Sequence, residues 1–567
     1  MQIYYHLEYV GVPRSYKWLN SNSCAKVWHQ LQHSYNQGAD RLWVFNVGDL
    51  KPVEVPLTLA LSLAWDVNKT TTMDELPSFF NTFIEKTLHL QRPESEKCAN
   101  LLLKYDRLVA LRKHEHIEKD TFSLLNYNEA QSILTRWTSL LNKAEELAFW
   151  IPENTKPSFF QLLLHPIKAS TIYISLRVAQ ARNHLYALQR RNTANKAFKQ
   201  VLSLFEKDFD LSQEYHSLLD GKWNHLMRQP HYGYSDSWHA PYRDMITGLS
   251  YVQARADSNP IMGFIGVSVE GHEGVRPGLT NEESDRTHPS RRDLVPGVTL
   301  PPLEPYGVKV RGFEVYCRGS RAVSWRVVSP YKWLSVSPEN GIISPNDEED
   351  TQVRVSVNWE DVPAGFDQEV LIDLHSSLGD FEQIHVPIRN RVPSGKGHGF
   401  VEADGHVSIY ATSFQNKPKG YQVLPFLGRF PSGAVTLAHP SKGGGEGEYL
   451  EYPFYTFTST TAALILEFTF TLDTAEQPMS YDIQVDEEAN STHRLISQSC
   501  AGQLPGGWAE SAMDCVWKRR HSLDLEAGQH LLRIKLDSEN CILEKIVLDL
   551  GGLRESYLGP PQSCALG

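Results

Sequence analysis

Five side chains near the amino terminus have the types and the spacing of a sugar-binding site. His6 and Tyr9 lie in one short apolar run and Arg14 follows in the next loop, whereas Asn46 and Asp49 close a second run. An aromatic ring can stack on a pyranose, an amide can bind hydroxyl groups, and a guanidinium can pair with a carboxylate. This combination suits an acidic sugar.

The two runs are predicted to be parallel strands at residues 2–9 and 41–47, connected by a helix. The first run is aromatic and β-branched, and the second is apolar throughout, as a parallel sheet covered on both faces requires. Residues 20–23 offer N-cap side chains for a helix that continues to Tyr35, with Gly38 as its stop signal. In a (β/α)8 barrel functional groups gather where strands end, so both strand ends would face one site.

A single strand–helix–strand unit cannot stand alone, because its strands keep two bare edges and no completed core. Either the unit pairs with another chain, or further barrel strands precede it, and we favour the second interpretation. Residues 1–70 are therefore expected to form the last strands of a (β/α)8 catalytic barrel.

The rest of the chain predicts three more regions. Residues 71–255 show apolar side chains at helical spacing, which indicates an α-helical bundle of about five to seven helices. Its run from 159 to 191 contains Pro166, so a kink or break is expected there. Residues 256–395 have the alternation typical of an immunoglobulin-like β-sandwich, and 396–567 resemble a jelly-roll-like β domain of the carbohydrate-binding type.

The composition argues against several partners. The 567 residues carry a net charge of −12 and no run of Lys or Arg, which disfavours nucleic acid and anionic membranes. The longest apolar stretch, Leu57 to Trp65, is far shorter than the roughly 20 residues of a membrane span. The histidines of segment 221–241 match no common metal-ligand spacing. We favour a packed connection for that segment over a sugar-chain subsite built from Trp238 or Tyr234.

The last domain leaves two alternatives open. Its four cysteines allow disulfides between Cys500 and Cys515 and between Cys541 and Cys564, or free thiols. Its aromatic residues could form a sugar platform, although burial is their commoner fate. The candidates for such a platform are Trp508, Trp517 and Tyr421.

Two motifs, YYHLEYVGVPRSYKW (4–18) and RLWVFNVGDLKP (41–52), resemble the paired signature of glycoside hydrolase family 115. The resemblance continues through SLLNYNEAQSIL and GKWNHLMRQPHYGY to the closing GGLRESYLGPP, and so covers nearly the whole chain. Members remove α-1,2-linked glucuronic or 4-O-methylglucuronic acid from xylan. The resemblance implies part of an inverting glycoside hydrolase that acts on glucuronoxylan or its oligosaccharides, without a metal or organic cofactor.

The matching motif positions imply that Tyr9 and Asn46 line the active-site pocket. His6, Arg14 and Asp49 lie in the same motifs and are further candidates for substrate binding. A salt bridge within the domain is an equal alternative for Arg14. A loop cap, or a partnership with a nearby lysine, is the alternative for Asp49.

No catalytic carboxylate is assigned within the chain. Glu8 is the nearest candidate, but alternation along the strand would point it away from Tyr9. The family's general acid and base lie on earlier barrel strands, so they are expected upstream and the chain alone is expected to be inactive. The alternative is a non-catalytic carbohydrate-binding or structural protein derived from such an enzyme.

The resemblance also bears on location and assembly. The chain shows no signal peptide, and an extracellular enzyme would have lost that segment together with the expected upstream sequence. Members often dimerise through their helical or sandwich domains, so the resemblance is compatible with a homodimer.

Overall fold

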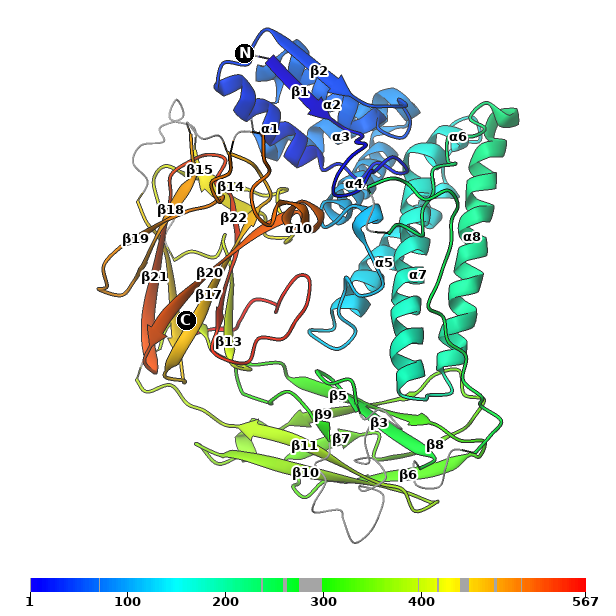
Figure 1. The fold of residues 1–567 in the computed structure, drawn as a ribbon, viewed down its shortest axis with the longest axis vertical. Helices are drawn as coiled ribbons and strands as arrows, with labels where there is room; N and C mark the ends of the chain where they lie inside the picture. The colour runs from blue at the N-terminus through cyan, green and yellow to red at the C-terminus, as the bar shows by residue number, and fades with distance from the viewer. Residues whose placement is uncertain are drawn as a thin grey trace.

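The computed structural model contains four parts that close into a ring (Figure 1). The amino-terminal sheet lies at the top of the view, long helices at the right, a β-sandwich at the bottom and the last β domain at the left. The described residues are 2–70, 72–235, 238–257, 263–274, 298–395, 397–415, 418–438, 448–473, 477–500 and 502–566.

The amino-terminal sheet consists of two parallel strands, β1 (Gln2–His6) and β2 (Leu42–Asn46), connected by helix α1 (Cys24–Asn36). The Ser23 side chain caps α1 by accepting the backbone N–H of Lys26 at 3.4 Å. The parallel pairing and the N-cap agree with the sequence-based prediction.

Strand β1 ends three residues earlier than predicted. His6 faces Asn46 as the last pair of the register, and Tyr9 then forms an antiparallel bridge with Tyr16 instead of extending the strand. The alternation argument for Glu8 was therefore wrong, because Glu8 and Tyr9 lie in the turn after the strand and not on its two faces.

A helical region follows the sheet, and its interruption falls where it was predicted. A π-helical segment (Phe160–Leu164) separates α6 from α7, and Pro166 lies in the first turn of α7, where no helical bond needs its missing N–H. The helices are α2 (Glu54–Trp65), α3 (Leu76–Leu88), α4 (Arg92–Val109), α5 (Glu129–Ala148), α6 (Lys156–Phe159), α7 (His165–Leu188) and α8 (Ala194–Gly221).

One hydrophobic core joins the amino-terminal sheet to these helices and to part of the last domain. It contains Leu7 after β1, Trp137 on α5 and Tyr173 on α7, together with Leu427 and Tyr557 from the last domain. The predicted boundary at residue 70 therefore crosses a continuous core, and the four predicted domain ranges stay predictions.

The middle β region packs two sheets around a separate core of alternating aliphatic side chains. One sheet has the order β4-β11-β10-β6-β8, and the other has the order β3-β5-β9-β7. Its strands are β3 (Ile265–Val269), β4 (Val298–Thr299), β5 (Val310–Cys317), β6 (Val323–Val328), β7 (Leu334–Ser337), β8 (Asn340–Ile343), β9 (Thr351–Val357), β10 (Asp367–Ser376) and β11 (Phe381–Arg389).

The last region also has two sheets, ordered β19-β18-β21-β16-β12-β23 and β14-β15-β22-β17-β20, with β13 paired to β22. Trp517 and Tyr421 are buried, and Trp508 packs against the same core, so all three contribute to packing. All seven cysteines are free thiols. The elements are β12 (Gly399–Val401), β13 (His406–Tyr410), β14 (Tyr421–Leu424), β15 (Ala434–Leu437), β16 (Leu450–Thr456), β17 (Thr460–Thr469), β18 (Ser480–Val485), β19 (Ser491–Arg494), α10 (Trp508–Asp514), β20 (Val516–Leu525), β21 (Gly528–Leu536), β22 (Leu543–Asp549) and β23 (Ala565–Leu566).

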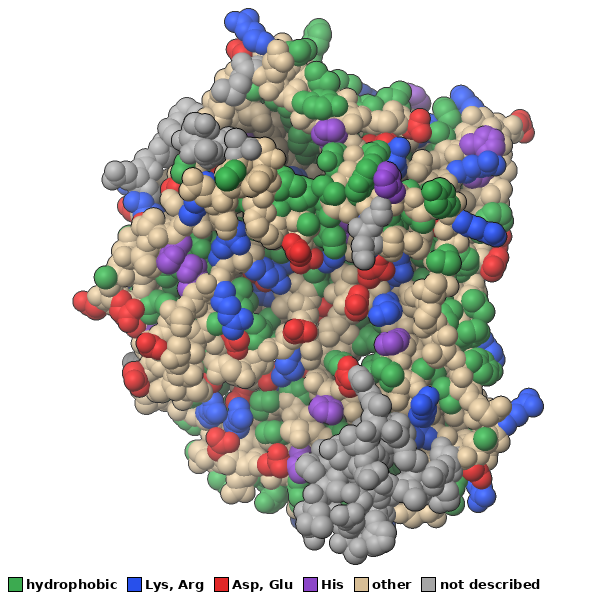
Figure 2. Space-filling view, viewed as in Figure 1, with side chains coloured by type: hydrophobic (Ala, Val, Ile, Leu, Met, Phe, Trp, Pro, Cys, Tyr) green, Lys and Arg blue, Asp and Glu red, His purple; other side chains and the backbone are tan. Residues whose placement is uncertain are grey.

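Charged side chains of both signs are interspersed over the face shown in Figure 2.

Within the ranges that the structure describes, no helix is both long and apolar enough to cross a membrane.

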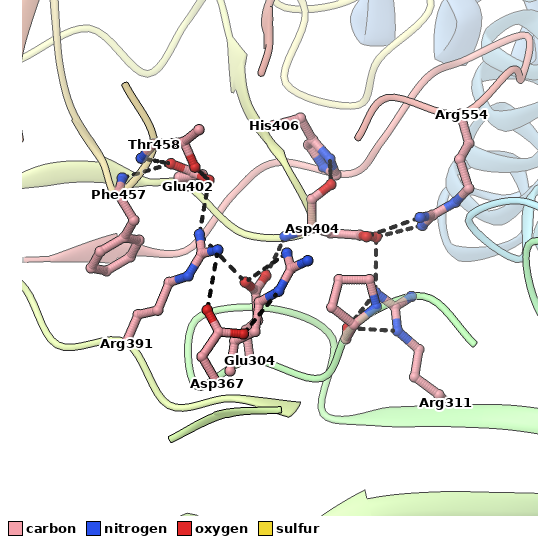
Figure 3. Close-up of polar contacts among 12 residues, drawn as sticks. Glu304, Arg311, Asp367, Arg391, Glu402, Asp404, His406, Phe457, Thr458 and Arg554 are labelled. Carbon is pink, nitrogen blue, oxygen red and sulfur yellow. Dashed lines mark hydrogen bonds and ion pairs between the residues drawn. The ribbon is translucent and has the colours of Figure 1, made fainter. Parts of the chain in front are cut away.

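Asp404 connects three of the four parts (Figure 3). Its carboxylate accepts hydrogen bonds from Arg311 of the sandwich and from Arg554 of the last domain, each at 2.9 Å. The backbone N–H of Arg554 in turn donates to the Tyr127 hydroxyl of the helical region at 3.0 Å. The side chains of Asp404 and Arg311 are only 7% and 1% exposed, so water cannot replace either partner.

Replacing this carboxylate should loosen the ring. Asp404→Asn keeps the size and tolerates the left-handed backbone (φ 55°), but it removes the carboxylate that pairs with Arg554. Arg311 loses one of its two carboxylate partners and keeps Glu270 at 2.5 Å. We expect the free energy of unfolding to fall by about 3 kcal/mol, the low end for breaking a buried pair. Denaturant unfolding monitored by circular dichroism measures it.

Asp367→Asn is the matched control, since this carboxylate is 58% exposed and lies 3.7 Å from Arg389 and 4.0 Å from Arg391. A loss within about 0.5 kcal/mol is expected for an exposed pair. Equal losses for the two variants would contradict the role of Asp404.

Candidate active site

The structure brings together three of the five predicted site residues, His6, Tyr9 and Asn46. The amide nitrogen of Asn46 donates to Nδ1 of His6 at 3.0 Å, so the ring proton of a neutral His6 resides on Nε2. The ring of Tyr9 meets that of His6 edge-on, with centroids 5.1 Å apart and planes at 89°. All three side chains are half-buried at the carboxyl ends of the two parallel strands.

The turn after β1 holds Tyr9 in place. Its backbone pairs with Tyr16, and the two rings lie 6.0 Å apart. The ammonium of Lys113 lies 3.9 Å from the centre of the Tyr16 ring. A side chain at Gly11 would overlap the Tyr9 ring, so the close approach of backbone and ring requires glycine there.

Arg14 is directed toward the helical region and not toward His6. Its guanidinium donates to the Glu118 carboxylate at 2.7 Å and to the backbone carbonyl of Glu115 at 2.9 Å, with only 12% of the side chain exposed. The buried Glu115 carboxylate accepts the backbone N–H groups of Lys17 and Trp18. The salt-bridge alternative is thus present, and a substrate contact by Arg14 stays a prediction.

The two acidic residues near the strand ends differ in their surroundings. Asp49 is exposed, and the described part of the chain offers it no ion pair or hydrogen bond. Lys51 pairs with Glu54 at 2.7 Å instead of with Asp49. Glu8 lies against Gly48 and pairs with Lys17 at 3.2 Å, which neutralises its charge.

His231 and Trp238, from segment 221–241, pack against the residues that follow β1. The ring of His231 stacks on Trp18 with centroids 3.6 Å apart, and its Nδ1 lies 2.6 Å from the Asp208 carboxylate. Ser15 donates to the carbonyl of Trp238 from its backbone at 3.0 Å and from its hydroxyl at 2.8 Å. These contacts agree with the interpretation of the segment as a packed connection.

Among the described residues no group of His, Cys, Asp or Glu could hold a metal ion.

Three buried histidines of the helical region should make the fold sensitive to acid. Burial lowers the pKa of His114, His116 and His165 from 6.5 to about 3. The unfolded chain binds protons at these groups below pH 6.5, whereas the folded chain does so only near pH 3. The free energy of unfolding should therefore fall as the pH is lowered through this window.

Urea unfolding at several pH values between 7.5 and 4.5 measures this slope. His116→Gln removes one of the groups and should flatten the slope, whereas the exposed His184→Gln should leave it unchanged. Identical slopes for the two variants would show that the buried histidines do not cause the acid sensitivity.

Two family models match the two ends of this chain. The model described as glycosyl hydrolase family 115 matches residues 1–116, which include all five predicted site residues. The model described as glycosyl hydrolase family 115 C-terminal domain matches residues 399–562. The chain belongs to glycosyl hydrolase family 115. No curated protein sequence matches it.

Among solved structures, the chain resembles a family GH115 4-O-methyl-α-glucuronidase with specificity for decorated arabinogalactans. The match has a TM-score of 0.57 at 14% identity and covers 96% of this chain and 51% of the other. At this identity the likeness shows the fold alone. The present chain spans about half the length of that enzyme. A family 35 carbohydrate-binding module from Clostridium thermocellum matches 25% of this chain and 97% of its own length at 14% identity, with a TM-score of 0.16.

Proposed function

We propose that this family 115 chain is part of a glycoside hydrolase that releases α-1,2-linked glucuronic or 4-O-methylglucuronic acid from xylan, with inversion. The cluster of His6, Tyr9 and Asn46 carries the proposal, because it lies at the carboxyl ends of parallel strands within the matched residues 1–116. With its amide nitrogen bound to His6, Asn46 keeps its amide oxygen for a sugar hydroxyl. Nε2–H of His6 offers a donor beside it, and Tyr9 offers a ring edge.

We further propose that additional strands flank β1 and β2 in the working enzyme and supply the general acid and base. Apolar side chains of the two strands remain in water, with Tyr4 66%, Leu42 48% and Val44 42% exposed, which supports a sheet that continues. An inverting pair needs two carboxyl groups roughly 6.5–9.5 Å apart. Glu8 is neutralised by Lys17, so we do not assign it to that pair.

If this is correct, the purified 567-residue protein should release no glucuronic acid from glucuronoxylan. The reason is that the described strand ends lack a suitable acid–base pair. Anion-exchange chromatography of the digest measures the product. Release by the pure protein would refute the need for further strands, whereas binding of the polymer without release would also suit a carbohydrate-binding protein.

In the enzyme with its barrel complete, Asn46→Ala should lower kcat/KM by about 10²–10³-fold, the magnitude found when one well-placed hydrogen-bonding group of an active site is removed. Asp49→Ala is the matched control, because its exposed side chain has no partner among the described residues, and a change below about three-fold is expected. Equal effects of the two substitutions would remove Asn46 from the site.

A further inference from the structure

A cavity that is open to solvent lies beside the loop that follows β2. Its volume is about 360 Å³, and it is lined by that loop, the end of α3, α6 with the π-helical segment after it, and the end of α8. Cavities of roughly 300–1,000 Å³ are typical of small-ligand sites. Residues that line it include Lys51, Phe83, Thr87, Gln161, Lys222 and Trp223.

We propose that this cavity binds a uronic acid, a pyranose that carries one carboxylate. The choice of a sugar acid over other monoanions rests on the proposed function. The site is separate from the His6–Tyr9–Asn46 cluster, whose residues do not line the cavity.

Two lysines and one tryptophan give the cavity its chemical character. The ammonium groups of Lys51 and Lys222 lie 4.5 and 4.9 Å from the centre of the Trp223 ring. Lys51 also donates to Glu54 at 2.7 Å and to the side-chain oxygen of Gln161 at 2.6 Å, so its bonds are used within the protein. Lys51 therefore holds the Trp223 ring in place, and its ammonium group already has hydrogen-bond acceptors within the protein.

Lys222 is the cation that remains for a ligand. It is exposed, and the described residues provide it with neither a carboxylate nor a hydrogen-bond acceptor. The cavity is lined by two lysines, Lys51 and Lys222, and by one acidic residue, Glu54. Its lining therefore has a net positive charge, although the whole protein has a net charge of −12. An anion is thus favoured there over a neutral or cationic molecule.

The walls fit the rest of a pyranose. Phe83, Leu162 and Trp223 provide apolar surface for the C–H face of a sugar ring. The hydroxyls of Thr87 and Ser158 also line the cavity, and neither has a hydrogen-bond partner among the described residues. A simple inorganic anion would use the lysine but leave these surfaces uncovered.

The backbone before Lys222 is held in a costly conformation. Leu219, Asp220 and Gly221 have consecutive positive φ angles of 52°, 56° and 81°, and they turn the end of α8 so that Lys222 and Trp223 reach the cavity. Left-handed conformations are unfavourable for non-glycine residues and persist mainly where their surroundings fix them, often at binding sites. The strain coincides with the two residues on which the proposed site depends.

The test is a ligand-observed NMR titration of the 567-residue protein with sodium D-glucuronate, with D-glucose as the neutral match. We expect saturable binding of glucuronate and none of glucose. Lys222→Glu should weaken binding at least ten-fold. Lys207→Glu makes the same charge change at an exposed position of α8 away from the cavity and should not.

Two further measurements distinguish this site from the strand-end cluster and from a site that binds any anion. Asn46→Ala should leave in place the glucuronate binding that Lys222→Glu removes; if Asn46→Ala abolishes all binding while Lys222→Glu changes nothing, the ligand occupies the strand-end cluster and the proposal fails. Inorganic phosphate at equal concentration should not displace glucuronate. Full displacement would show that the cavity binds anions in general and does not recognise the sugar. Because the readout is binding, inactivity toward glucuronoxylan of the enzyme with its barrel complete would refute the proposed function without deciding this site.

Discussion

The shared carboxylate of Asp404 is the contact on which the closed arrangement of the chain depends. It lies in the turn between β12 and β13 and holds Arg311 of the sandwich and Arg554 of the last domain, while the backbone of Arg554 is bonded to Tyr127 of the helical region. Burying one carboxylate and two guanidiniums is costly unless each keeps its partners. The carboxylate therefore connects the sandwich to the last domain, and Arg554 extends this connection to the helices through its backbone N–H.

The strand-end cluster depends on the helical region in its own way, because the turn after β1 has little regular structure. The helical region fixes that turn through Glu115, which accepts two backbone N–H groups, and through Glu118, which binds Arg14. Tyr9 is thus positioned by residues about a hundred places later in the sequence. Arg14 acts on the cluster indirectly, as a positioning residue, and its charge is compensated before any ligand arrives.

Local signals were sufficient to predict what depends on local chemistry. The Ser23 cap, the parallel pairing of the first strands and the interruption near Pro166 follow from residue types within a few positions. The early end of β1 could not be predicted, because the bridge between Tyr9 and Tyr16 is imposed by a turn that distant acids anchor. The partner of Arg14 lies 104 residues away, so no local pattern distinguishes its salt bridge from a substrate contact.

The distribution of charge narrows how an acidic sugar could be held. At the strand ends Arg14 is bound to Glu118 and Lys17 to Glu8, so the cluster offers neutral donors and acceptors and no unpaired cation among the described residues. Such a set suits sugar hydroxyls better than a carboxylate. The cation that lacks an acceptor near β2 is Lys222, on the far side of the loop that begins after Asn46. The two neighbouring surfaces thus differ in charge, because the strand-end cluster is neutral and the cavity beside Lys51 has a cation without an acceptor among the described residues.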